Sequence, residues 1–91
     1  VAALDKANIS HGVGKDVIVM GFDCNKWALA ELLAGNWNYD GQCNPFQASY
    51  IHEIIQGLKA GKAPAQKVVI MTEKGFDAAT ITADDVATYG I

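Results

Sequence analysis

Apolar residues in this chain occur both as solid runs and as stripes at helical spacing. Residues Val17–Phe22 form one run that polar side chains do not interrupt, and Val68–Met71 form another. Continuous apolar runs of this length are typical of strands buried on both faces, as in a parallel sheet covered by helices. The pattern therefore predicts two inner strands of an α/β fold.

Two stripes at helical spacing lie between these runs, and each predicts a helix. Asn25 can cap the first helix and Gly35 can end it, because glycine accepts the left-handed conformation common at helix ends. The second helix begins near Pro45 and closes at Gly61. The stripes consist of Leu29, Leu32 and Leu33 in the first helix and of Ile51, Ile54, Ile55 and Leu58 in the second.

The remaining segments complete an alternating order of helices and strands. Val1–Asn8 has the composition of a helix end, and Asn36–Asn44 is predicted to be a short strand or a crossing segment. Thr82 and Asp85 are spaced like a capping box that opens a last helix ending at Gly90. The expected fold is α/β, with a parallel sheet flanked by helices.

Composition indicates a folded globular chain without a membrane span. Hydrophobic residues make up 51% and charged residues 19% of the 91 positions. The formal net charge is −3, and the seven lysine and arginine residues are scattered, so no basic face for nucleic acid is expected. Because the chain starts without methionine, inside a helix-like segment, we expect it to be a piece of a longer protein.

Polar side chains follow the first strand, where open α/β sheets bind their ligands. Asp23 can accept hydrogen bonds from ligand hydroxyls or cap the next helix, whereas Asn25 fits a cap better than a ligand contact. Gln42 and Asn44 would point to the same side of an extended segment. Their amides suit a polyol, although a polar bend before Pro45 would also explain them.

Other residue types give weaker indications of chemistry. Trp27, Trp37 and Tyr39 can either stack on a sugar ring or serve in packing. His11 and His52 lack companions at metal-ligand spacing, so both are expected on the solvated surface. No metal site and no cofactor is predicted.

The two cysteines, Cys24 and Cys43, are expected near each other at the ends of two strands. A bridge between them would close a loop of about 20 residues, worth roughly 3 kcal/mol in the chain-entropy model. Both thiols can equally stay reduced. No local partner would turn either one into a nucleophile, so no catalytic residue is predicted.

Five segments in order carry a resemblance to a known family. The chain resembles the periplasmic sugar-binding proteins of ABC transporters, of the ribose- and galactose-binding type. The likeness extends over nearly the whole chain, which would correspond to about the last quarter to third of such a protein. The segments are Lys15–Asp23, Leu33–Gly35, Gln42–Pro45, Gly57–Lys62 and Ala79–Val86.

The resemblance implies a binding protein and not an enzyme. Such proteins have two α/β lobes joined by a hinge, close on a monosaccharide or similar polyol, and deliver it to the permease subunits in the membrane. Their location is periplasmic or extracellular, with or without a lipid anchor. Residues 1–91 would then be a C-terminal fragment whose helix at residues 45–60 belongs to the other, mostly missing lobe. Such a fragment is expected to self-associate.

The resemblance also assigns roles to particular residues. The aspartate of the family's Gly-Phe-Asp motif bonds sugar hydroxyls, and it is Asp23 here. Many members place glutamine two residues before the later proline, where this chain has Cys43, whereas others have Glu-Cys-Asn-Pro, with Gln42 at the glutamate position. The candidate ligand-binding residues are Asp23, Gln42, Asn44 and Asn25.

A second interpretation is the effector-binding domain of a lac-repressor-like transcription regulator. Such domains share this fold and the Gly-Phe-Asp motif. They more often carry a second acid after that aspartate, where this chain has Cys24.

Overall fold

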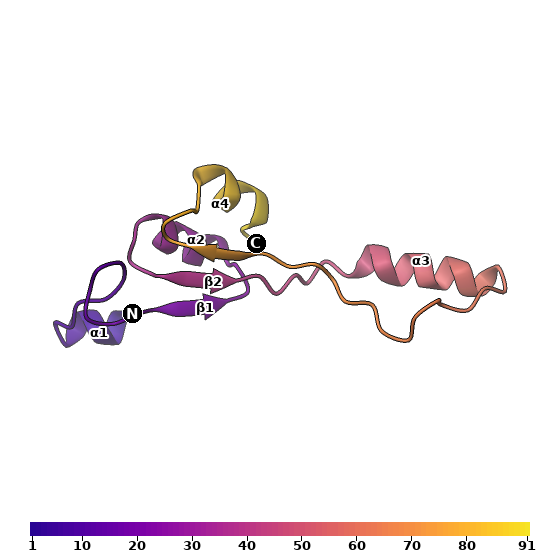
Figure 1. Cartoon of the computed structure of the whole chain (residues 1–91), viewed down its shortest axis with the longest axis horizontal. Coiled ribbons are helices and arrows are strands. Elements are labelled where there is room, and N and C mark those ends of the chain that lie inside the picture. Colours follow the sequence, from indigo (N-terminus) through magenta and orange to yellow (C-terminus); the bar gives the residue numbers. More distant parts are fainter.

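The computed structural model describes residues 1–91 as an α/β protein with a mixed three-stranded sheet and four helices (Figure 1). The strand order is β1-β2-β3; β1 runs parallel to β2, and β3 runs antiparallel to it. Along the chain the elements are α1 (Ala2–Lys6), β1 (Met20–Phe22), α2 (Lys26–Leu33), β2 (Tyr39–Gly41), α3 (Ala48–Lys59), β3 (Gly75–Asp77) and α4 (Ala83–Tyr89).

Helices cover one face of the sheet. Helix α2 packs against β2, and α4 packs against α2, as Figure 1 shows. Gly21 lets the ring of Trp37 approach the sheet, because a Cβ atom at that position would lie 2.4 Å from the ring. The core between sheet and helices consists of Cys24, Leu29, Leu32, Phe76 and Ile81.

The first strand is shorter than predicted and lies bare on one side. The ladder with β2 pairs only Met20–Phe22 with Tyr39–Gly41. Upstream, Val19 bonds with Asn38 outside the ladder, through its amide to the Asn38 side chain and through its carbonyl to the Asn38 amide. The prediction of burial on both faces was wrong, since Ile18, Met20 and Phe22 are 70%, 68% and 77% exposed.

The predicted strand at Val68–Met71 was also wrong. This segment has no regular secondary structure and joins no ladder, and Ile70 is 87% exposed. The third strand is instead Gly75–Asp77, in which Phe76 alone is buried. Because β3 is antiparallel to β2, the predicted all-parallel sheet is replaced by a mixed one. The apolar run at Val68–Met71 has no partner strand within these 91 residues.

The helices agree better with the sequence pattern. Thr82 and Asp85 form the predicted capping box at the start of α4, each side chain bonding the other residue's amide. Gly35 and Gly61 follow α2 and α3 with φ of 80° and 75°, the left-handed conformation expected there. Asn25 occupies the N-cap position of α2, but its side chain makes no capping hydrogen bond.

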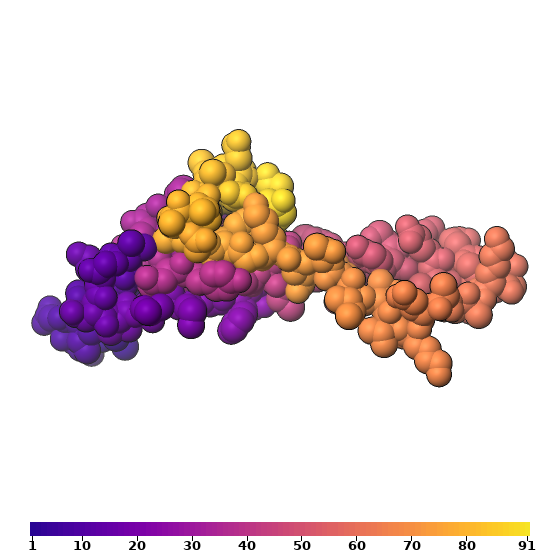
Figure 2. All heavy atoms as spheres, in the orientation of Figure 1, coloured from indigo at the N-terminus to yellow at the C-terminus, as the bar shows by residue number.

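Helix α3 forms an arm that projects from the body of the molecule (Figure 1). The molecule measures 61 × 24 × 18 Å and has a radius of gyration of 18.1 Å, against about 12 Å for a compact chain of this length. The space-filling view in Figure 2 shows the arm as a narrow extension. None of its residues is buried, so its apolar stripe lacks the cover that stabilises an amphipathic helix.

None of the four helices is both long and apolar enough to cross a membrane.

Candidate functional site

A hollow of about 190 Å³ brings together three of the four candidate ligand-binding residues. It lies where the turn after β1, the segment leading from β2 to α3, and the C-terminal end of α4 meet. Asp23, Gln42 and Asn44 line it, whereas Asn25 does not. The other lining residues are Cys43, Pro45, Phe46, Thr88, Tyr89 and Ile91.

Asp23 lies in a strained turn. Its φ is 86° and that of Cys24 is 54°, and a non-glycine residue in this region costs of order 1–3 kcal/mol. Backbone hydrogen bonds hold the turn: the Asp23 amide donates to the carbonyl of Gly41 at 2.9 Å, and the Ile91 amide donates to that of Cys24 at 3.1 Å. The Asp23 side chain is exposed, and its carboxylate accepts no hydrogen bond from the chain, so it is free to receive a ligand.

Gln42 and Asn44 use their side-chain oxygens within the protein. The Gln42 Oε1 accepts from the Lys74 amide at 3.1 Å, and the Asn44 Oδ1 accepts from the Phe46 amide at 2.9 Å. The side-chain NH₂ groups of both residues donate no hydrogen bond within the protein. Each NH₂ group has two N–H donors. The hollow therefore offers one charged acceptor and two neutral sets of donors.

No cationic side chain lines this hollow. Lys74, the nearest lysine in the return segment, forms an ion pair with Asp85 at 2.7 Å and lies 4.8 Å from the ring centres of both Phe76 and Tyr89. Its hydrogen bond to Asp85 raises the pKa of Lys74 and lowers that of the Asp85 carboxyl. With Asp23 unpaired and Lys74 engaged, the hollow disfavours anions.

Asp40 is buried in β2, two residues before Gln42, and was not singled out from the sequence. It is 0% exposed, and neither of its carboxylate oxygens makes a hydrogen bond of regular geometry. Burial raises the pKa of the Asp40 carboxyl, the nearby amides of Cys24 and Gly41 oppose that rise, and the Asp23 charge adds to it. Asp40 pairs with Gly21 in the sheet, and its side chain lies on the face that the helices cover. The sequence could not show this, because a three-residue strand is too short for alternation of polar and apolar residues to reveal its buried face.

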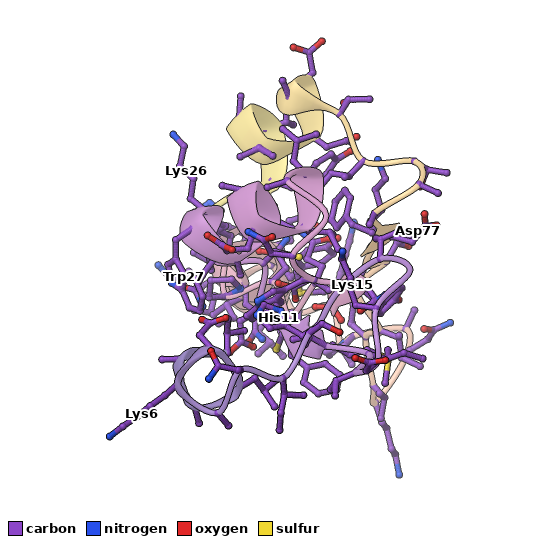
Figure 3. All side chains as sticks on the ribbon, turned by 90° about the vertical axis from the view of Figure 1, so that its left-hand side faces the viewer. Lys6, His11, Lys15, Lys26, Trp27 and Asp77 are labelled. Atoms are coloured by element: carbon purple, nitrogen blue, oxygen red, sulfur yellow. The ribbon has the colours of Figure 1, made fainter.

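The aromatic residues of the hollow differ from those considered in the sequence. Trp27 and Trp37 pack edge to face, with ring centres 5.6 Å apart, and neither lines the hollow. In Figure 3, Trp27 lies at the side of the body next to α2. Phe46 and Tyr89 line the hollow instead. Phe46 follows Pro45 and Tyr89 precedes Gly90, and these neighbours indicate helix ends and not a ligand site.

His11 is not the free surface residue that was expected. Its Nε2 lies 2.8 Å from Asp5 Oδ1, and its Nδ1 lies 3.0 Å from the carbonyl oxygen of Asn36. The bonds to Asn36 and Asp5 raise the pKa of His11. Figure 3 shows His11 against the body, whereas Lys6 and Lys26 extend away from it in different directions. No group of three His, Cys, Asp or Glu side chains is placed to hold a metal ion.

Larger hollows lie elsewhere, but they lack this combination of groups. One of about 310 Å³ lies between α3 and the segment that follows it, with Ile54, Pro64 and Val69 among its lining. Another, of about 470 Å³, lies between α1 and α2 beside Trp27 and Trp37. The carboxylates of the second, Asp5 and Glu31, already accept hydrogen bonds from the protein, and the first has the Lys62 cation in its lining.

Both cysteines are free thiols, which is the reduced alternative of the two considered. Cys43 is exposed at the hollow, whereas Cys24 is 1% exposed. Burial, with smaller effects from the Asp40 and Asp23 charges, raises the pKa of the Cys24 thiol to about 11. Only about one Cys24 thiol in a thousand is then ionised at pH 8, and the thiolate is the reactive form.

We therefore expect the two thiols to differ in reactivity. Iodoacetamide at pH 8 should modify Cys43 about a hundredfold faster than Cys24, because Cys24 is both buried and protonated. Peptide mass spectrometry over a time course measures the two rates, and in urea they should converge. Equal rates in the folded chain, or two thiols that react only after reduction, would contradict this arrangement.

Comparison with known proteins gives a structural likeness only. No known family matches the sequence, and no curated protein matches it. The fold is similar to that of a protein from Mycobacterium smegmatis in a crystal structure, with a TM-score of 0.70 and 24% sequence identity. The likeness covers 86% of this chain and 25% of that one, so this chain spans about a quarter of the length of the structure it matches.

Proposed function

We propose that this chain is part of a solute-binding protein of an ABC transporter, which binds a monosaccharide or similar polyol reversibly and delivers it to the permease. The observation that carries the proposal is the set of free polar groups around the hollow. Asp23 offers an unpaired acceptor, and Gln42 and Asn44 offer unpaired donors, with no cation beside them. Sugar hydroxyls both donate and accept, so they fit such a set.

The finer fold belongs to the same proposal: a two-lobed protein with these residues as its C-terminal portion. The path of the chain supports it. The chain leaves the sheet after β2 and returns before β3, and these two crossings lie side by side. The Gln42 amide donates to the Lys74 carbonyl at 2.9 Å, and the Asn44 amide donates to Glu73 Oε1 at 2.6 Å. Paired crossings that deliver α3 outside the body fit a hinge to a second lobe.

Binding without a chemical step agrees with the groups present. Neither histidine lines the hollow beside Cys43, and burial keeps Cys24 protonated, so neither thiol has an activating base. A receptor that hands its ligand to a membrane permease works outside the cytoplasm. A periplasmic or extracellular location is therefore part of the proposal.

The test is calorimetry of the two-lobed parent against a panel of neutral sugars. A hydrogen bond to a charged group contributes about 1.5–3 kcal/mol, so Asp23→Ala should weaken binding of the preferred sugar roughly ten- to a hundredfold. Glu53→Ala is the matched control, because this exposed carboxylate lies on α3, away from the hollow. Unchanged affinity in Asp23→Ala would remove Asp23 from the site. If no sugar binds, the proposed function is wrong.

A further inference from the structure

Asp40 is the one fully buried charged side chain of the molecule, and nothing described so far uses it. It is 0% exposed and its two oxygens lack regular hydrogen-bond partners. Burying an unpaired carboxylate is costly, and such groups are almost always paired or hydrogen-bonded. A neutral side chain of similar size would fit the same place at lower cost. The position therefore calls for a reason other than stability.

The neighbours of Asp40 indicate that reason. It precedes Gly41, whose carbonyl accepts from the Asp23 amide, and its carboxylate is faced by the amides of Cys24 and Gly41. Asp23 and Cys24 are the two consecutive non-glycine residues with left-handed backbone, and such strain persists only where the surroundings impose it. A buried charge acts strongly on a nearby amide, because little water is present to screen it.

We propose that Asp40 is a positioning residue: its carboxylate attracts the Cys24 amide, fixes the left-handed Asp23–Cys24 turn, and so aims the Asp23 side chain into the hollow. The functional part of this inference rests on the proposed ligand-binding role of Asp23. Asp40 itself does not line the hollow, so its action on a ligand is indirect. The second backbone constraint comes from Ile91, whose amide bonds the Cys24 carbonyl from the other side.

Ionisation of Asp40 should have two opposite effects: the charged carboxylate attracts the Cys24 amide, but its burial makes the charge costly and lowers the stability of the fold. Because its pKa is raised in the folded state, the native chain holds this proton longer than the unfolded chain does. The contribution of Asp40 to stability is therefore fully present below the ordinary pKa of 3.8 and falls as the pH rises through the folded-state value. The ionisable groups coupled to it are Asp23 and Cys24 in the turn, and Glu73 in the return segment acts on Cys24.

The first test compares the wild-type chain with Asp40→Asn by urea unfolding between pH 3 and pH 7. The asparagine variant should have the higher urea midpoint at pH 7, and the difference should vanish below the ordinary pKa of an aspartate. The exposed control Glu53→Gln should show no such difference. A lower midpoint for Asp40→Asn at pH 7 would make Asp40 an ordinary structural residue and overturn the proposal.

The second test follows the turn itself by NMR. In an Asp23→Asn background, which removes the titration of Asp23, the Cys24 amide signal should move with pH in a single step. That step should disappear when Asp40→Asn is added, because the charge facing the amide is then gone. A Cys24 signal that moves equally in both chains would contradict a role for Asp40.

Neither of these measurements needs a ligand, so their outcome is independent of the proposed function. In the two-lobed parent, Asp40→Asn should weaken sugar binding roughly tenfold at pH 7 while the protein gains stability. Unchanged binding would limit Asp40 to the backbone and overturn its positioning role. If the wild-type parent binds no sugar while both ligand-free tests give the expected results, the proposed function is wrong but the role of Asp40 in the turn stands.

Discussion

Leu32→Ala is expected to lower the free energy of unfolding by about 2–5 kcal/mol, a large part of the whole stability of a domain this small. Leu32 is 0% exposed, on the face of α2 that meets the sheet. The core is limited to five residues in one cluster, so the cavity left by alanine has few neighbours that could close it. Urea unfolding followed by circular dichroism measures the loss.

Leu33→Ala is the matched control, because it makes the same chemical change one position along the same helix. Leu33 is 44% exposed and lies outside the core cluster. Its replacement should change the free energy of unfolding by about 0.5 kcal/mol or less, as for an ordinary surface site. If Leu33→Ala costs as much as Leu32→Ala, the packed face of α2 has been assigned incorrectly.

Self-association of the isolated chain is the second large effect, and we expect substitutions on α3 to abolish it. Ile51, Ile55 and Leu58 are 52%, 45% and 55% exposed, whereas Ile54 is partly covered by the segment that follows the helix. Each exposed side chain forgoes roughly 1.5–3 kcal/mol of burial, so a partner that covers the stripe gains several times that amount. In the isolated chain we propose a second copy as that partner, in a symmetric or domain-swapped pair.

Light scattering coupled to size exclusion tests this expectation. Wild-type chain should elute as a dimer or larger species at micromolar concentration, and Ile51→Glu combined with Ile55→Glu should make it monomeric. His52→Glu combined with Gln56→Glu adds the same two acids at exposed positions beside the stripe without removing an apolar side chain, and should leave the assembly unchanged. A strictly monomeric wild-type chain would show that α3 needs no partner.

The sequence predicted local elements well where the determinants were local. The capping box of Thr82 and Asp85, and the glycines after α2 and α3, act within one turn of a helix, and all of them are confirmed. Spacing also identified the buried side of α2 at Leu29 and Leu32, whereas Leu33, which was predicted on the same stripe, is 44% exposed. Such features depend on neighbours a few residues away, which a sequence displays directly.

The strands could not be predicted in the same way, because pairing depends on partners distant in the chain. Val68–Met71 has the composition of a buried strand but finds no partner here, whereas Gly75–Asp77 pairs with β2 despite its glycine and aspartate. Ile18, just before β1, and Ile70 are exposed for the same reason, because no other segment of the chain packs against them. An apolar run indicates that cover is needed without showing where it comes from.

The candidate site was partly predictable for the same physical reason. Asp23 follows β1 and so lies at the carboxyl end of that strand. Gln42 and Asn44 follow β2, the parallel neighbour of β1, so they line the same hollow as Asp23. Tyr89 reaches the hollow only through the packing of α4 on α2. Asp40 required knowledge of which face of β2 is covered, and that depends on the whole fold.

The most direct test of the proposed binding site is an NMR titration of the 91-residue chain with neutral monosaccharides. We expect at least one of them to shift the amide signals of Asp23, Gln42 and Asn44 in a saturable way, with a dissociation constant of about 1 mM or weaker, since this chain would supply only part of the cleft. The shifts should disappear in Asp23→Ala and persist in Glu53→Ala. Signals that stay unchanged at saturating sugar concentrations, or shifts confined to residues outside the hollow, would contradict the assignment of Asp23, Gln42 and Asn44 as a sugar-binding site.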